Sequence, residues 1–212
     1  MSGLKVSQIL HSLRPQDAHV SHIYLVGSRL WGTHTEGSDF DLLLVAERLG
    51  LETLRSQHKG QYDITLLTKE EFAARVQGGS LIETVCCLLS GDEACVLQEG
   101  ESMKRLVQDI HVLDAWVTSR HPVDHEKAKK FWLKGKRKDG FKVLQHMITA
   151  DSVLRGLRKK VQEGRELSSI TLTVAELHDF VQGGRDESDW NWLGLEWGEV
   201  KEAHAVRLKG AE

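Results

Sequence analysis

The chain has 212 residues, which corresponds to one large domain or two small ones, and its 40% hydrophobic and 28% charged residues with 2 prolines exclude a disordered or collagen-like chain. No apolar run approaches the roughly 18–20 residues of a membrane span, no secretory signal pattern is present, and the three cysteines lack disulfide or zinc-site spacing, so we expect a cytoplasmic protein that does not enter a membrane. The formal net charge of -3 excludes a strong overall attraction to nucleic acid or anionic membranes.

The first hundred residues combine strands and helices. Apolar runs bounded by turn residues predict three strands, at 22–27, 40–45 and 62–67, and a short extended segment at 94–97. Helical spacing of apolar residues predicts helices at 6–13 and 80–89, while residues 28–32 begin a loop or a helical turn. Thr68 and Glu71 form a capping-box pattern, which predicts the start of a further helix.

The second half has a helical pattern throughout. We expect helices at 101–119, 173–182 and 186–208, and another at 124–160 with breaks near Gly135 and Gly140. A glycine- and acid-rich stretch near residues 91–101 separates this part from the first. The sequence therefore predicts a small α/β domain at 1–98 followed by an all-α domain at 99–212.

A Gly-Ser turn and three aspartates carry the chemistry. Gly27 and Ser28 close the first predicted strand, where a glycine allows a triphosphate to approach the backbone and a hydroxyl can bond its oxygens. Asp39 and Asp41 flank one apolar residue at the start of the next strand, so their side chains project to the same face. Such a pair is costly unless a cation such as Mg²⁺ lies between the charges. Asp63 adds a third carboxylate on a neighbouring strand, and the set suits phosphoryl or nucleotidyl transfer.

This pattern resembles the DNA polymerase β superfamily of nucleotidyltransferases. The resemblance implies an α+β fold, with a small mixed β-sheet nucleotidyltransferase domain followed by an all-α C-terminal domain. It implies that Asp39, Asp41 and Asp63 are catalytic and bind two Mg²⁺ ions, with Mn²⁺ as a substitute, and that Gly27 and Ser28 bind the triphosphate. The string GSRLWGTHTEGSDFDL is similar to a branch of stand-alone nucleotidyltransferases that includes RNA-repair-associated members.

The expected reaction is magnesium-dependent transfer of NMP from an NTP, such as ATP, to a hydroxyl acceptor with loss of pyrophosphate. The preferred acceptor is an RNA 3′ end, in RNA repair or tRNA processing. A protein hydroxyl (NMPylation or AMPylation) and a small molecule are alternatives. A catalytically inert nucleotide- or RNA-binding module is the alternative from another functional class.

The preference for RNA comes from a basic segment. Residues 127–142 contain eight lysines and arginines against one aspartate, a local net charge of +7. Helical spacing places four lysines along one stripe: Lys127, Lys130, Lys134 and Lys138. Such a stripe is either a solvated helix face or a contact surface for a polyanion. We assign Lys130 and Lys134 as candidate nucleotide ligands together with Arg29, whose alternative role is an ion pair with an acid such as Glu36.

Other motifs have weaker functional interpretations. Arg120 and His125 have the Arg-x4-His spacing of a ribonuclease motif of all-α HEPN domains, but Pro122 between them favours a helix-breaking turn. Three tryptophans near the C-terminus, Trp190, Trp192 and Trp197, are candidate core residues or anchors for a protein partner. The adjacent Cys86 and Cys87 are interpreted as small core residues.

Overall fold

The computed structural model of the chain describes residues 19–48 and 56–183. The helices expected at 6–13 and 186–208, and the tryptophans of the C-terminal segment, lie outside the described residues. In the part that is described, no helix is long and apolar enough to cross a membrane.

A five-stranded mixed sheet forms the first part of the fold. In spatial order its strands are β3 (Ser56–Lys59), β4 (Tyr62–Thr68), β2 (Phe40–Ala46), β1 (Val20–Val26) and β5 (Val96–Gln98). The central pair β2 and β4 is parallel, and the other three pairs are antiparallel. This arrangement confirms the expected mixed sheet and its apolar strands.

Strand β3 is a strand that the sequence did not predict. Its residues, Ser-Gln-His-Lys, are all polar, so they show neither the alternation nor the apolar run that indicates a strand. It lies at the edge of the sheet and pairs with β4 through the turn at Gly60, which has a φ of 61°. A polar edge strand is formed by pairing with its neighbour, and its own composition does not signal it.

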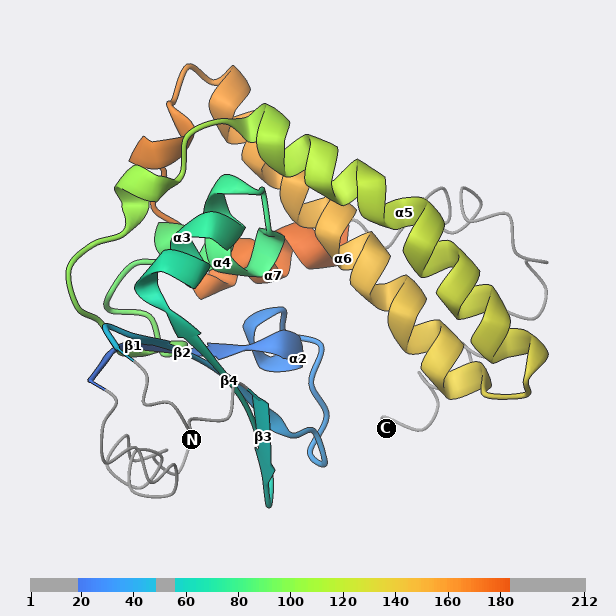
Figure 1. Cartoon of the computed structure of the whole chain (residues 1–212). Coiled ribbons are helices and arrows are strands. Elements are labelled where there is room, and N and C mark those ends of the chain that lie inside the picture. Colours follow the sequence, from blue (N-terminus) through green and yellow to red (C-terminus); the bar gives the residue numbers. More distant parts are fainter. Residues whose placement is uncertain (1–18, 49–55, 184–212) are drawn as a thin grey trace.

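Among the described residues of the first part, the strands are accompanied by the helices α2 (Gly27–Leu30), α3 (Lys69–Gln77) and α4 (Leu81–Leu88). The capping box before α3 is confirmed, because the Glu71 N–H donates to the Thr68 hydroxyl at 3.1 Å and the Thr68 N–H donates to the Glu71 carboxylate at 2.8 Å. Figure 1 shows α3 and α4 on the same side of the sheet as α7. All three cysteines are buried and free.

The second part is built around a long helical hairpin. Its elements are η1 (Lys104–Leu106), α5 (Ile110–Leu133), α6 (Arg137–Gln162), η2 (Leu167–Ser169) and α7 (Val174–Gly183). Helices α5 and α6 lie side by side, and the end of the hairpin at which α5 meets α6 projects away from the sheet (Figure 1). The α+β class with a helical second part is confirmed.

The predicted start of the first long helix and the predicted turn at Pro122 are both wrong. The helix expected from residue 101 begins only at Ile110, where the Asp109 side chain accepts from the His111 N–H at 2.9 Å. The turn expected around Pro122 is absent, because α5 continues through it. Packing of buried Leu113 and Val117 stabilises α5 despite the hydrogen bond that a proline removes.

Of the two expected breaks in the 124–160 helix, the one at Gly135 is confirmed, with a φ of 74° between α5 and α6. The one at Gly140 is wrong, because Gly140 lies within α6. A Cβ added there would lie 3.0 Å from the Ala128 carbonyl oxygen of α5. This glycine therefore permits close packing of the two helices and does not end one of them.

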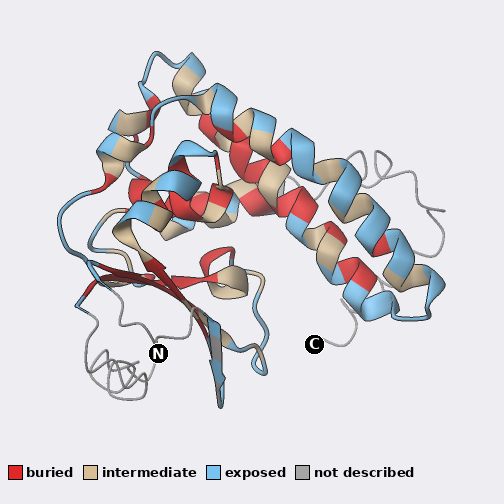
Figure 2. Cartoon of the chain, in the orientation of Figure 1, coloured by how far each residue is buried: buried red, intermediate tan, exposed pale blue. Residues whose placement is uncertain are grey.

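One hydrophobic core joins the sheet to the helical part. Leu44 and Val45 of β2, Leu157 of α6 and Leu177 of α7 are fully buried members of it. Figure 2 shows buried segments both in the sheet and in the helices. A second, smaller cluster between α5 and α6 contains Ala128, Phe141, Leu144, Met147 and Ile148. Since the larger core contains residues from both sides of residue 98, the division into 1–98 and 99–212 stays a prediction about chain organisation.

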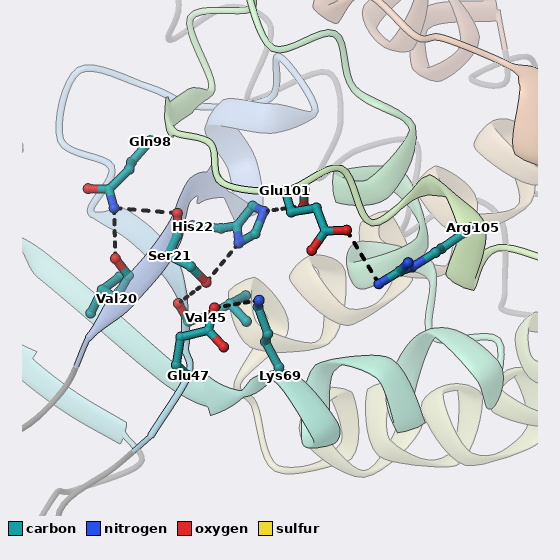
Figure 3. A network of polar contacts seen from close by, with 9 residues as sticks. All are labelled: Val20, Ser21, His22, Val45, Glu47, Lys69, Gln98, Glu101 and Arg105. Atoms are coloured by element: carbon teal, nitrogen blue, oxygen red, sulfur yellow. Dashed lines mark hydrogen bonds and ion pairs between the residues drawn. The ribbon is translucent and has the colours of Figure 1, made fainter.

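A polar network fastens the segment after β5 to the sheet (Figure 3). The buried His22 ring places Nδ1 3.0 Å from the Ser21 hydroxyl and donates from Nε2 to the Glu101 carbonyl at 3.1 Å. The Gln98 side-chain amide donates to the Val20 carbonyl at 2.7 Å. These bonds fix the path of the chain where it leaves the sheet for the helical hairpin.

Candidate active site

The turn between β1 and α2 lies directly against a carboxylate. Gly27 has a φ of 64°, and a Cβ at this position would lie 1.9 Å from Oδ2 of Asp41. The Ser28 main-chain N–H donates a hydrogen bond to that carboxylate. Glycine is therefore required here both by the backbone conformation and by the close approach of Asp41.

The parallel pairing of β2 and β4 brings two of the predicted carboxylates together. Asp41 pairs with Asp63 in the strand register, and Phe40 pairs with Tyr62. Paired residues of adjacent strands project to the same face, and Asp39 precedes Asp41 by two positions, so the aspartates share one face. Asp41 is half-buried, whereas Asp39 and Asp63 are exposed.

The electrostatics of Asp41 reflect this crowding. Burial raises the pKa of the Asp41 carboxyl, and the negative charges of Asp63 and Asp39 raise it further. The ammonium group of Lys142 and the Ser28 N–H act in the opposite direction. A half-buried carboxylate beside two others is a site at which a bound cation lowers the free energy.

Asp63 also binds a residue that the sequence did not single out. Nδ1 of His58, on β3, lies 2.6 Å from Oδ1 of Asp63, and this hydrogen bond raises the pKa of His58. The sequence does not point to His58, because it does not predict strand β3 and because His58 belongs to no recognisable motif. Across residues 19–48 and 56–183, no three His, Cys, Asp or Glu side chains are grouped closely enough to hold a metal ion. The carboxylate oxygens of Asp41 and Asp63, which pair in the strand register, are of the chemical kind that hard cations take as ligands, and Oδ1 of Asp63 is engaged by His58.

Arg29 binds the main chain at the start of β2. Its Nη2 donates to the Ser38 carbonyl at 2.8 Å and its Nε to the Asp39 carbonyl at 3.3 Å. Its guanidinium carbon lies 3.7 Å from the centroid of the Phe40 ring. The proposed contact of Arg29 with a nucleotide stays a prediction.

The basic segment divides between two places. Lys142, in α6, is close enough for its charge to lower the pKa of Asp41, a position that depends on tertiary structure and that its place in the sequence does not reveal. Lys130 and Lys134 are exposed at the end of α5, where they line a surface hollow with Lys127, Lys129, Glu126 and Leu133. This end of the hairpin projects away from the sheet (Figure 1). The single stripe of four lysines is wrong, since Lys138 lies on α6, beyond the turn at Gly135.

The helical part also supports the loop that follows α2. A Cβ at Gly32 would lie 2.8 Å from the imidazole ring of His178 in α7. Gly32 has a φ of 67°, so a side chain there would be strained as well as crowded. The segment between the Gly-Ser turn and the carboxylates therefore rests on α7.

Comparison with known families agrees with the geometry. Residues 5–78 match the nucleotidyltransferase domain family. The matched segment contains Gly27, Ser28 and the three aspartates, whereas all the lysines considered above lie beyond it. No curated protein matches the sequence.

Proposed function

We propose that the nucleotidyltransferase domain of this chain transfers NMP from an NTP to a hydroxyl acceptor, with an RNA 3′ end as the preferred acceptor. The observation that carries the proposal is the placement of Asp41, which pairs with Asp63 in the register and lies against Gly27 and Ser28. This juxtaposes a turn suited to phosphates with carboxylates suited to a cation.

Asp39, Asp41 and Asp63 would hold the Mg²⁺ ions, or Mn²⁺ in their place. When bound, such ions polarise the phosphate and lower the pKa of the attacking hydroxyl. The fit to this chain is supported by the register pairing of Asp41 with Asp63 and by the position of Asp41 against Gly27, and burial together with the two neighbouring charges raises the pKa of Asp41.

The protein groups have separate tasks in the transfer. The Ser28 hydroxyl and the Lys142 ammonium bind triphosphate oxygens beside the turn at Gly27, while the Ser28 main-chain N–H stays bonded to the Asp41 carboxylate. Asp63 accepts the proton of the acceptor hydroxyl, whose oxygen forms the new bond to the α-phosphorus. The bond from that phosphorus to the bridging oxygen breaks, and pyrophosphate leaves with the bonding electrons.

The end of the α5–α6 hairpin supports RNA as the acceptor. Lys127, Lys129, Lys130 and Lys134 are exposed around one hollow, and residues 127–142 carry a net charge of +7. Such a density of cations on a protein with a net charge of -3 is a local attraction for a polyanion. Transfer to a protein hydroxyl is the alternative acceptor chemistry, and RNA repair or tRNA maturation is the context that the preferred acceptor suggests.

The test is transfer of α-labelled ATP, CTP, GTP and UTP, with Mg²⁺ or Mn²⁺, to total RNA, total protein and the chain itself. Label in RNA that disappears in the Asp39→Ala/Asp41→Ala variant supports the proposal. Label in the protein fraction would identify the acceptor as a side-chain hydroxyl and not as RNA. Absence of transfer in every fraction contradicts the proposed reaction.

A second candidate function is nucleotide or RNA binding without chemistry. The bond between His58 and Asp63 favours it, because it engages one of the three carboxylates. In that case NTP binding is saturable and Mg²⁺-dependent, but no pyrophosphate is released in the presence of RNA.

A further inference from the structure

Arg29 connects the Gly-Ser turn to the strand that carries the carboxylates. It lies in α2, a helix of only four residues that begins at Gly27. Two of its three guanidinium nitrogens donate to successive carbonyls, those of Ser38 and Asp39. The planar fork of arginine fits such a pair of acceptors, and a lysine ammonium cannot reproduce it.

The same guanidinium belongs to a stack of three side chains. Its carbon lies 3.7 Å from the Phe40 ring centroid, and the Phe40 ring lies 5.7 Å from the Tyr62 ring at an angle of 42°. The stack therefore joins α2, β2 and β4 at the level where Phe40 pairs with Tyr62. Cation–π and tilted aromatic contacts of this kind favour one relative position of the three elements.

The stack and the carboxylates occupy opposite faces of the same strands. Asp41 and Asp63 directly follow Phe40 and Tyr62, and successive side chains of a strand alternate between faces. Contacts that hold the Phe40 side chain on one face therefore also fix the direction in which the Asp41 side chain projects on the other face. The carbonyl of Asp39 is held by the same guanidinium, so both members of the Asp39 and Asp41 pair are affected.

We infer that Arg29 is a positioning residue, which orients the Asp39 and Asp41 carboxylates through the start of β2, and that it is not a nucleotide ligand. The inference rests on the proposed function for its catalytic consequence. The predicted effect of Arg29 on the affinity of the carboxylates for a divalent cation can be measured without any nucleotidyl transfer.

The experiment compares Arg29→Lys, Arg29→Met and Phe40→Leu with the wild-type chain. Mn²⁺ affinity is measured by calorimetry without nucleotide, and ATP affinity is measured separately in EDTA. We expect all three variants to weaken Mn²⁺ binding about tenfold and to lower kcat by about 10- to 100-fold, because misplacement by about 1 Å has effects of that size. ATP affinity in EDTA should change by less than about threefold, and Arg29→Lys, although it keeps the charge, should not rescue kcat.

Arg105→Met is the matched control, since the Arg105 side chain is 76% exposed in its pair with Glu101. Circular dichroism verifies folding of each variant. If Arg29→Met does not fold, Arg29→Lys and Phe40→Leu decide the result, because they are the milder changes. The double variant Arg29→Lys/Phe40→Leu should lose little more Mn²⁺ affinity than either single variant, since both changes break the same stack.

Two outcomes overturn the inference. One is unchanged Mn²⁺ affinity in the Arg29 variants. The other is a tenfold loss of ATP affinity in Arg29→Met that Arg29→Lys restores, which is the behaviour of a nucleotide ligand. A wild-type chain that binds Mn²⁺ but transfers nothing contradicts the proposed function alone, and the Mn²⁺ affinities of the variants still decide the role of Arg29.

Discussion

The surroundings of Asp41 in the fold destabilise its negative charge. Its carboxylate is half-buried, lies against Gly27 and pairs in register with Asp63, and these surroundings raise its pKa. Conflict of this kind is typical of functional sites, where stability is lowered locally in favour of binding or chemistry.

Asp41→Asn separates the functional from the structural contribution of this charge. We expect it to lower transfer by about 10³-fold or more, because the amide is a poorer cation ligand and carries no charge. In EDTA it should raise the free energy of unfolding at pH 7. The folded-state pKa is raised, so ionisation of Asp41 costs stability as the pH rises above the ordinary carboxyl value of 3.8.

Urea unfolding of both proteins across a pH series measures this effect. The stability advantage of Asp41→Asn should appear as the pH rises above about 4 and disappear below it, where the wild-type carboxyl is protonated. Added Mg²⁺ should stabilise the wild-type chain and not the variant. A variant less stable than the wild-type chain in EDTA at pH 7 would contradict the described surroundings of Asp41.

His22 makes the attachment of the segment after β5 sensitive to acid. Burial lowers the pKa of this imidazole, with the nearby Lys69 charge acting in the same direction and the hydrogen bond to Glu101 opposing it. An unfolded chain therefore takes up a proton near pH 6.5 at a histidine that stays neutral in the fold until a lower pH. Its contribution to stability is complete above pH 6.5 and is lost as the pH falls below that value.

His22→Gln should reduce the dependence of the unfolding free energy on pH below 6.5. Urea titrations at several pH values provide the measurement, and His34→Gln, at an exposed histidine, is the matched control. Equal slopes in wild-type and His22→Gln proteins would show that His22 does not titrate differently in the fold.

At the scale of elements, patterns among neighbouring residues predicted helices and strands correctly. Features that depend on the pairing of distant elements were not predicted. The capping box at Thr68 and the apolar strand at 40–45 depend on neighbours in the sequence, and both were predicted. Strand β3 forms by antiparallel pairing with β4 at the edge of the sheet. The polar residues of β3 do not indicate a strand. In the same way, helix continues through Pro122 and Gly140 because α5 and α6 pack together, which no local pattern shows.

An ion pair joins α3 to the buried Glu83 carboxylate of α4, with Arg75 half-exposed. The Glu83 side chain is 5% exposed, and its carboxylate accepts from Nη1 of Arg75 at 2.9 Å and from the Ser80 hydroxyl. Arg75→Met leaves a buried carboxylate with one partner removed, so we expect a loss of about 1–3 kcal/mol in the free energy of unfolding.

Arg120→Met is the matched control for Arg75→Met, because Arg120 and Asp124 form an i,i+4 pair on α5 worth about 0.3–0.5 kcal/mol. Chemical denaturation measures both losses. The double variant Arg75→Met/Glu83→Gln should recover part of the stability, since it removes the unpaired charge. An equal loss in the two single variants would contradict a special role for the pair of Arg75 with the buried Glu83 carboxylate.

At the scale of the whole molecule, the motif predicted the centre of the site but not its surroundings. Gly27, Ser28 and the aspartates lie within about forty residues, and their strand positions follow from the pattern. The charge of Lys142 acts on Asp41 because the fold brings the start of α6 near the site, and His58 lies against Asp63 only because β3 pairs with β4. Both interactions depend on tertiary structure, which the spacing of residues in one sequence does not show.

The division of the basic segment gives a prediction for the intact protein. Lys130→Ala/Lys134→Ala should weaken RNA binding and reduce the slope of log affinity against log salt by about 1–2, because up to two phosphate contacts are lost. Lys142→Ala should instead raise the KM for the NTP, since its ammonium is near Asp41.

Filter binding at several salt concentrations and steady-state kinetics measure the two effects. Lys104→Ala, at a lysine that contacts the Thr171 hydroxyl far from the hairpin end, controls for loss of a positive charge. A raised KM for the NTP in Lys130→Ala/Lys134→Ala, with RNA binding unchanged, would assign these two lysines to the nucleotide.

The most direct measurement of the central claim is pyrophosphate release from NTP in Mg²⁺ with and without an RNA acceptor, by the wild-type chain and by Asp41→Asn. The account predicts RNA-dependent release by the wild-type chain that falls by about 10³-fold in Asp41→Asn and is abolished by EDTA. Release that is equal in the two proteins, or NTP binding without any release, would contradict it.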